Sequence, residues 1–317
     1  MKRTLYRICL IILIFFSVGF ISFITMKPDP LLPEQQIQLK EGKTFWTWNS
    51  PAGNQSIHYV EKGTGSKHII LIHGFRAYSY TWRHLVEPLA QAGFHVWAID
   101  MIGYGLSDKP EASYKPDFFL KQIKAFMDDH AISQAHFIGN SMGGGLSLCM
   151  ALSYPQYINS LTLISALGYP LELPFYVRLC KDIDGIWPPF LGPTMIRKGL
   201  EQIVYHKEVI TDEQVQAYAL PYRLPGGSES ALNTLRNFDN QILKLMRSGY
   251  KNVQCPVLII WGDQDQLIPL EHYHHFCRDF PFAQKQLLKD CGHIPQEEQP
   301  EEVKNQIIKF LNSYYKI

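Results

Sequence analysis

One serine of this chain lies in a setting that is typical of an enzymatic nucleophile. Ser141 is the centre of the motif Gly-Asn-Ser-Met-Gly at 139–143, with a short apolar run before it and a helix-like stretch after it. A strand, a glycine-bounded serine and a helix make a nucleophile elbow, in which a sharp turn holds the hydroxyl clear of the backbone. Small residues are needed around such a turn, and the N-terminus of the following helix favours developing negative charge. The motif therefore predicts covalent catalysis by Ser141.

A serine hydroxyl is a weak nucleophile until a base accepts its proton and a third group orients that base. Asp263 and Asp265 follow one apolar run, and His293 follows the last predicted strand. Active sites of open α/β sheets form at the carboxyl ends of strands, and the order Ser, Asp, His is the one expected for this elbow. We select Asp265, because Asp263 is close enough to the strand end to serve as a turn residue. A turn-forming role stays the alternative for both aspartates.

An oxyanion that forms during acyl transfer needs hydrogen-bond donors. The backbone N–H of Met142, directly after the nucleophile, is one predicted donor. The N–H of Phe75 is the other, in the loop at 73–76 that follows an apolar run. Gly74 permits close approach of the backbone at that point. A plain glycine turn is the alternative interpretation of this loop.

Short apolar runs alternate with helix-like stretches along most of the chain. The pattern predicts an opening antiparallel strand pair and then strands that are buried on both faces. This alternation indicates an α/β fold with a mostly parallel sheet and helices on both faces. Pro88 is expected to kink or shorten the first predicted helix. The predicted strands are 44–48, 56–61, 68–72, 94–99, 135–138, 161–165, 257–261 and 284–288, and the predicted helices are 80–92, 116–130, 142–154 and 300–314.

The alternation stops between residues 168 and 240. Prolines are frequent there, and the stretches between them look helical. We interpret this segment as a helical cap that is inserted into a catalytic core. The two parts of the core are then residues 44–167 and 241–317. Residues 28–43, with three prolines near their start, are predicted to be a stiff linker.

The N-terminal segment has the features of a membrane anchor. Three cationic residues precede an uncharged apolar run over residues 8–26. As a helix, the run spans about 28 Å, close to the bilayer core of about 30 Å. The positive charges favour a cytoplasmic N-terminus and a catalytic domain on the translocated side. Residues 1–27 are therefore predicted to be a single-pass anchor. One alternative is a cleaved signal, which would give a secreted or periplasmic protein. The other is a buried core helix.

Composition narrows the classes of function. The chain has 46% hydrophobic and 19% charged residues, so it can bury a sizeable core. Its net charge is +1 and it contains no basic run, so it lacks the features of nucleic-acid binding. The six cysteines are scattered without a Cys-x-x-Cys pair, so no metal site is expected. A disulfide among Cys180, Cys255, Cys277 and Cys291 stays open. The glycines at 103 and 105 lack the third glycine of a dinucleotide loop, so we expect a turn there and no cofactor.

Taken together, these motifs resemble the α/β-hydrolase superfamily over residues 44–317. The chain is most similar to lipases and esterases with a helical cap, and its N-terminal segment resembles membrane-bound monoacylglycerol lipases. Haloalkane dehalogenases and epoxide hydrolases have similar loops but use an aspartate where this chain has Ser141. The resemblance rests on HGF at 73–75, DMIGYGLSD at 100–108, GNSMG at 139–143, GDQD at 262–265 and GH at 292–293.

The sequence thus predicts a serine hydrolase that cleaves carboxylic esters, with Ser141, His293 and Asp265 as its triad and Phe75 and Met142 as its oxyanion donors. The anchor and the apolar cap favour a lipid-like or otherwise apolar ester as substrate. Carbon–carbon bond hydrolases of the superfamily also use a serine, so carbon–carbon cleavage by the same triad is an alternative. A non-catalytic member that only binds small molecules is another.

Overall fold

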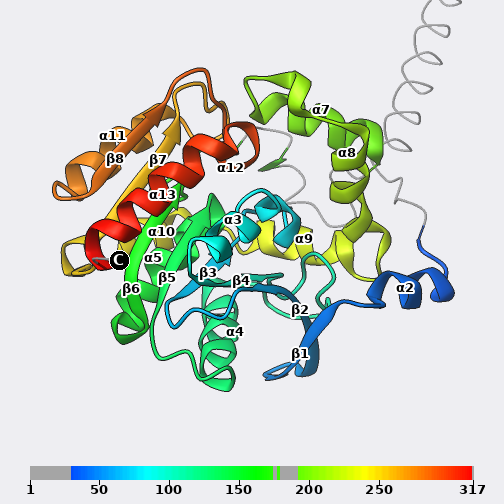
Figure 1. Cartoon of the computed structure of the whole chain (residues 1–317). Helices are drawn as coiled ribbons and strands as arrows, with labels where there is room; N and C mark the ends of the chain where they lie inside the picture. Colours follow the sequence, from blue (N-terminus) through cyan, green and yellow to red (C-terminus); the bar gives the residue numbers. More distant parts are fainter. Residues whose placement is uncertain (1–29, 174–176, 179–191, 316–317) are drawn as a thin grey trace, which may run out of the picture.

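The computed structural model describes residues 30–173, 177–178 and 192–315. Eight strands form one sheet in the spatial order β1-β2-β4-β3-β5-β6-β7-β8 (Figure 1). β1 and β2 pair antiparallel, β2 is antiparallel to β4, and the remaining neighbours are parallel. The mostly parallel sheet predicted from the sequence is confirmed. Its strands are β1 Thr44–Ser50, β2 Gly53–Lys62, β3 His68–Ile72, β4 His95–Ile99, β5 Ala135–Asn140, β6 Ile158–Ile164, β7 Val257–Gly262 and β8 Gln284–Leu288.

Helices and short 3₁₀ turns connect and cover these strands. They are α2 Pro33–Lys40, η1 Ser79–Trp82, α3 Val86–Gln91, α4 Pro116–Asp129, α5 Met142–Ser153, η2 Pro155–Tyr157, α7 Pro193–Ile203, η3 Lys207–Val209, α8 Asp212–Ala219, η4 Leu220–Arg223, α9 Gly227–Arg236, α10 Asn240–Ser248, η5 Tyr250–Asn252, α11 Leu270–Asp279, α12 Pro295–Glu298 and α13 Pro300–Tyr315.

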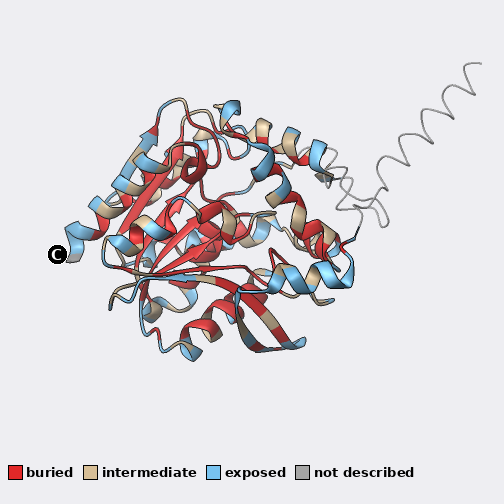
Figure 2. Ribbon diagram, turned by 45° about the vertical axis from the view of Figure 1, so that its right-hand side comes forward, coloured by how far each residue is buried: buried red, intermediate tan, exposed pale blue. Residues whose placement is uncertain are grey.

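Alternating residues of the central strands face two separate apolar layers. Ile69 and Leu71 of β3 pack with α3 and α13, whereas Ile70 and Ile72 of the same strand pack with α4, α5, α10 and α11. Side chains alternate across a strand, so a run that is apolar throughout buries both faces of the sheet. Figure 2 shows the buried strands between these helical layers. Because both faces of the central strands are packed, the ends of these strands are held in fixed positions.

The helix predicted over 80–92 is replaced by two shorter elements. The 3₁₀ turn η1 ends at Trp82, and α3 begins only at Val86. Pro88 lies within the first turn of α3, where a backbone N–H has no partner inside the helix and proline is tolerated. The proline thus falls near the beginning of the observed helix, and the predicted kink within a longer helix was wrong.

The segment between β6 and β7 carries the helices α7, α8, α9 and α10. In Figure 1, α7 and α8 lie away from the sheet, whereas α9 passes close to the middle of the molecule. Helices α7, α8 and α9 share an apolar cluster of their own, whereas α10 packs with the layer that covers the sheet. The shared cluster includes Leu200 of α7, Val215 of α8 and Ala231 of α9, and it reaches Ile294 beside the predicted catalytic histidine. Part of the predicted cap, residues 174–176 and 179–191, lies outside the described residues.

Residues 28–43 were expected to form a stiff linker, but their described part contains the helix α2. Pro33 occupies the first turn of this helix, a position that favours proline. Leu31, just before it, is buried against Leu106 and Leu224, and its N–H donates to the carbonyl of Arg223 at 3.0 Å. The chain is therefore attached to the main body from residue 31 onward.

The predicted membrane anchor at residues 1–27 lies outside the described part of the chain. Within the part that is described, none of the helices combines the length and the apolar character that crossing a bilayer requires. The four cysteines that are described, Cys149, Cys255, Cys277 and Cys291, are all free, while Cys9 and Cys180 fall in the undescribed segments.

Candidate active site

Ser141 occupies a strained turn between β5 and α5. Its φ and ψ are 54° and −119°, a region that costs non-glycine residues free energy and is found at functional sites. The Ser141 N–H donates to the carbonyl of Ile164 at 3.0 Å, which fixes the turn to β6. A Cβ on Gly139 would lie 2.3 Å from the carbonyl oxygen of Gly143, and one on Gly143 would lie 2.0 Å from that of Ile72. Both glycines are therefore required for this turn, as the sequence predicted.

The structure brings His293 and Asp265 together. The Nδ1 atom of His293 is 2.8 Å from Oδ2 of Asp265, and both side chains are buried. The second carboxylate oxygen of Asp265 accepts the backbone N–H groups of Leu267 and Ile268, each at 2.9 Å. Asp263 instead accepts the N–H of Cys291 at 3.4 Å. Asp265, which the sequence analysis selected over Asp263, is thus the aspartate whose carboxylate contacts the imidazole.

The backbone of His293 is held from two sides. Its N–H donates to the carbonyl of Ile203, at the end of α7, at 2.6 Å. Its carbonyl accepts the side-chain amide of Asn140 at 3.2 Å, and the same amide donates to Ile164 at 3.1 Å. Sequence reasoning missed Asn140. Its position just before the nucleophile was the available signal, but an asparagine in a tight turn indicates only turn formation.

The loop at 73–76 lies against the nucleophile. A Cβ added at Gly74 would be 3.2 Å from Cβ of Ser141, so this glycine allows the backbone to approach. His73 accepts the N–H of Met101 through Nε2 at 3.0 Å, and burial lowers the pKa of His73, which keeps the ring neutral and able to accept. Phe75 lines the same cavities as Ser141. The predicted donors Phe75 and Met142 thus lie beside Ser141, and their catalytic role stays a proposal.

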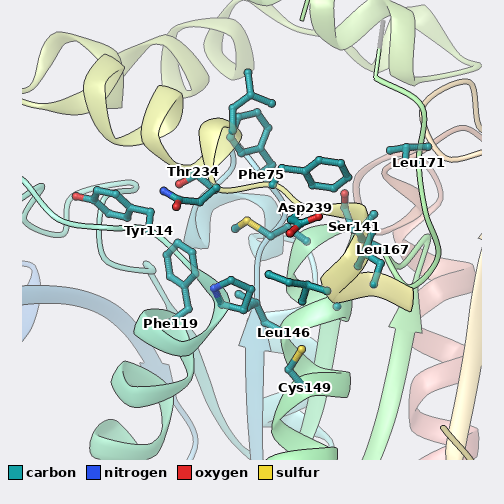
Figure 3. Close-up of a pocket in the computed structure, with 18 of the residues that line it drawn as sticks. Phe75, Tyr114, Phe119, Ser141, Leu146, Cys149, Leu167, Leu171, Thr234 and Asp239 are labelled. Carbon is teal, nitrogen blue, oxygen red and sulfur yellow. The ribbon is translucent and has the colours of Figure 1, made fainter. Parts of the chain in front are cut away.

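Two cavities meet at Ser141. The larger has a volume of about 260 Å³, and it lies between α4, α5 and the α9–α10 region (Figure 3). Its wall is almost entirely apolar: Asp239 is the only charged side chain among the described lining residues, and lysine, arginine and histidine do not occur there. The described residues that line it are Phe75, Tyr114, Pro116, Phe119, Ser141, Met142, Gly145, Leu146, Cys149, Leu167, Leu171, Leu173, Val177, Thr234, Leu235, Asn237, Phe238, Asp239, Ile242, Leu243, Met246, Leu267 and Ile268.

The smaller cavity has a volume of about 160 Å³ and contains both Ser141 and His293 in its wall. Residues of α7, among them Ile196 and Leu200, and Tyr218 of α8 form its cap side. The predicted nucleophile and the predicted base therefore border one space, on the side of the site that faces the cap.

The loop at 100–108 is organised by a buried carboxylate. Burial alone would raise the pKa of Asp100, but His58, 2.8 Å away, together with His73 and the N–H of Leu106, holds it below its usual value. A Cβ on Gly105 would lie 2.1 Å from Oδ2 of Asp100. The glycines here form a turn around this carboxylate, as predicted.

Within the described residues, no group of three potential metal ligands of the His, Cys, Asp and Glu types lies close enough to hold an ion.

A family model described as alpha/beta hydrolase fold matches residues 67–300. The chain belongs to this family. The resemblance noted from the motifs is thereby confirmed at the level of the superfamily, and the fold class with it.

Among curated relatives, the chain is 26% identical to the 2-hydroxy-6-oxononadienedioate/2-hydroxy-6-oxononatrienedioate hydrolase of Burkholderia vietnamiensis (strain G4 / LMG 22486), over 80% of this chain and 90% of the relative. It is 27% identical to the bifunctional epoxide hydrolase 2 of Mus musculus, over 81% of this chain and 53% of that protein. The narrower resemblance to membrane-bound monoacylglycerol lipases is not supported, because these relatives are hydrolases of other substrates.

Solved structures share the fold. A meta-cleavage product hydrolase, CumD, aligns with a TM-score of 0.74 at 26% identity over 84% of this chain and 98% of that one. A membrane phospholipase A described as a bacterial virulence factor aligns with a TM-score of 0.68 at 22% identity over 99% of both chains. The second likeness establishes the fold alone. The family and the two curated relatives are hydrolases by name, which agrees with a hydrolytic enzyme.

Proposed function

We propose that this α/β hydrolase is a serine esterase that acts on apolar carboxylic esters. The observation that supports the proposal is the position of Ser141 where an apolar cavity meets a smaller cavity bordered by His293. The described part of the larger cavity's wall has no cationic side chain. It therefore favours an uncharged acyl group, since a carboxylate beside these residues would lack a partner. The relatives are all named as hydrolases, but their names imply that they cleave different kinds of bond. The choice of bond for this chain is therefore argued from its own site.

In the proposed reaction, Ser141 Oγ attacks the ester carbonyl while His293 takes its proton. Asp265 accepts a hydrogen bond from Nδ1 of His293 and stabilises the imidazolium that forms. The N–H groups of Phe75 and Met142 donate to the tetrahedral oxyanion. His293 then passes the proton to the leaving alkoxide, which departs as an alcohol. Water, deprotonated by His293, attacks the acyl-enzyme, and the acid leaves as Ser141 regains its proton.

The positions of the two cavities assign the two halves of the substrate. The leaving oxygen must receive a proton from His293, so the alcohol is placed in the smaller cavity, which His293 lines. The acyl chain is then placed in the larger apolar cavity beyond Ser141. Burying each CH₂ group there would contribute about 0.8 kcal/mol to binding. An apolar chain is therefore the acyl group that this cavity fits best.

Carbon–carbon bond hydrolysis by the same triad is the second candidate, and the curated relatives favour it. The hydrolase of Burkholderia vietnamiensis is named for dienedioate substrates, which carry two carboxylates. The described wall of the larger cavity offers those carboxylates no cation, and its one charge, on Asp239, has the same sign. A carbon–carbon hydrolase built on this site would therefore take a substrate without a carboxylate in that cavity.

A direct test compares the two reactions on one preparation. We expect the protein to hydrolyse p-nitrophenyl esters of medium-chain acids and to leave vinylogous diketone acids of the dienedioate type intact. Ser141→Ala should lower ester turnover by about a million-fold and abolish labelling by a fluorophosphonate. Ser147→Ala, a serine further along α5 whose hydroxyl donates to Gly143, serves as the matched control. Cleavage of the diketone acids without ester hydrolysis would replace the first proposal by the second.

We keep the N-terminal anchor as a separate proposal that rests on the sequence alone. The apolar run at 8–26 and the cations before it support it. The full chain is expected to stay with membranes after carbonate extraction, whereas a chain that begins at residue 28 should appear in the supernatant. Recovery of the full chain in the supernatant would rule the anchor out.

A further inference from the structure

Two consecutive carboxylates follow the loop that carries His293, and the reaction proposed above does not use them. Glu297 and Glu298 form the end of the short helix α12, and both are buried. A buried carboxylate is costly unless donors surround it. The hydrogen-bond donors to these two carboxylates come from distant parts of the chain, so the pair connects separate elements of the fold.

The carboxylate of Glu297 joins the core to the cap. From the core, Thr81 donates its hydroxyl to it at 2.6 Å and Arg83 its guanidinium at 2.5 Å. From α8 of the cap, Gln214 donates its side-chain amide at 2.7 Å, and Tyr218 donates its hydroxyl. Two donors thus belong to each side. Removing the cap from this position would leave a buried charge with only its core partners.

The neighbouring Glu298 makes a second connection, directly at the histidine loop. Its carboxylate accepts the N–H of Gly292 at 3.2 Å and the N–H groups of Tyr205 and His206, just after α7, at 3.0 and 3.3 Å. Burial raises the pKa of Glu298, and these N–H groups oppose that effect. In the same place the N–H of His293 donates to Ile203 of α7. The loop is thus bonded to the cap directly at His293 and, through Glu298, at Gly292.

The connections continue to the substrate. Tyr218, which donates to Glu297, also lines the smaller cavity together with His293 and Ser141. Gly292 is held so close to the cap that a Cβ there would lie 2.3 Å from the carbonyl of Ile203. The cap and the histidine loop therefore form one packed unit, and a shift of α8 is transmitted to the base through α12.

We propose that Glu297 is a positioning residue, whose buried carboxylate seats cap helix α8 on the core and thereby keeps His293 aligned with Ser141. The inference rests on the proposed function, because it takes His293 as the base for Ser141. On this view the cap does more than cover the substrate: its seating decides whether the nucleophile is activated. A misplacement of about 1 Å at a catalytic group can cost a hundred-fold in rate.

The test uses three variants of the full chain. Glu297→Gln removes the charge, and Gln214→Met removes one cap donor while keeping the side-chain volume and all core donors. Gln216→Met, at an exposed position of the same helix α8, is the matched control. For each variant, kcat and KM for a short p-nitrophenyl ester are measured, together with the rate at which a fluorophosphonate labels Ser141. Thermal melting shows which variants are folded at the assay temperature.

We expect Glu297→Gln to lower kcat and the labelling rate by about 10- to 100-fold, with KM nearly unchanged. Gln214→Met should lower both rates more weakly. Gln216→Met should match the wild type. If Glu297→Gln does not fold, the comparison of Gln214→Met with Gln216→Met decides. Wild-type labelling rates in both buried-site variants, or a change in KM alone, would overturn the positioning role. Absence of labelling in the wild type would instead remove the proposed function.

Discussion

At the scale of single residues, the site depends on which groups can reach one another. Asp263 and Asp265 differ by two positions, and only Asp265 lies 2.8 Å from Nδ1 of His293. Its second oxygen is occupied by two backbone N–H groups, so the carboxylate cannot easily rotate away. This double attachment is what an orienting group needs, since it fixes both the tautomer and the direction of the imidazole.

Asp265→Asn is expected to lower kcat by about 10³- to 10⁴-fold, because the amide no longer stabilises the imidazolium and favours the wrong tautomer. Asp263→Asn is the matched control and should leave kcat close to that of the wild type, since the Asp263 carboxylate is hydrogen-bonded to the N–H of Cys291 and Asp265 is the residue bonded to the imidazole. Steady-state kinetics with a p-nitrophenyl ester measure both. Equal losses in the two variants would contradict the assignment of Asp265.

At the scale of elements, α5 borders both the predicted nucleophile and the larger cavity. Its N-terminus follows Ser141, and its later turns present Leu146 and Cys149 to the larger cavity (Figure 3). Burial raises the pKa of the Cys149 thiol to about 11, so at neutral pH the thiol is protonated and acts as a small apolar group. In the proposed reaction, one helix therefore carries both the reacting oxygen at its start and part of the acyl site along its length.

Cys149→Phe should fill part of the larger cavity and shift acyl preference toward short chains. We expect kcat/KM for a long-chain ester to fall by about ten-fold or more, while that for an acetyl ester stays near the wild-type value. A series of p-nitrophenyl esters of increasing length measures the shift. Cys149→Ala, which removes atoms from the same position, should keep the long-chain activity. An equal loss for all chain lengths would argue against acyl binding in this cavity.

At the scale of the whole molecule, the sheet supports the site by burying both of its faces. His136 lies in β5, the strand that leads to Ser141, and it is almost completely buried. Its Nδ1 is hydrogen-bonded with the hydroxyl of Ser160 on the neighbouring strand β6. Burial, the main cause, lowers the pKa of this imidazole to about 3. The neutral ring is therefore part of the folded core.

This burial predicts a loss of stability in acid. The unfolded chain takes up a proton at this residue near pH 6.5, whereas folded His136 stays neutral to about pH 3. The unfolded state therefore binds more protons in that window, and His136 should contribute a fall of about 3 kcal/mol in the free energy of unfolding between pH 7 and pH 4. Urea denaturation should show that His136→Gln removes most of this dependence, while His274→Gln, at an exposed position, keeps it. An unchanged pH dependence in His136→Gln would contradict a buried neutral ring.

The sequence by itself determined the sheet, the elbow and the order of the candidate triad. Apolar runs and glycine spacing reflect local requirements, such as strands buried on both faces and a turn in which Gly143 allows no side chain. Only the tertiary structure showed that Asp265, which the sequence analysis had selected, is hydrogen-bonded to His293. It also placed Asn140 on the backbone of His293 and Glu297 under the cap. Those contacts join residues 28 to 216 positions apart, and residue types alone do not specify a partner so far along the chain. The larger cavity likewise forms only where α9 and α10 pack near α5.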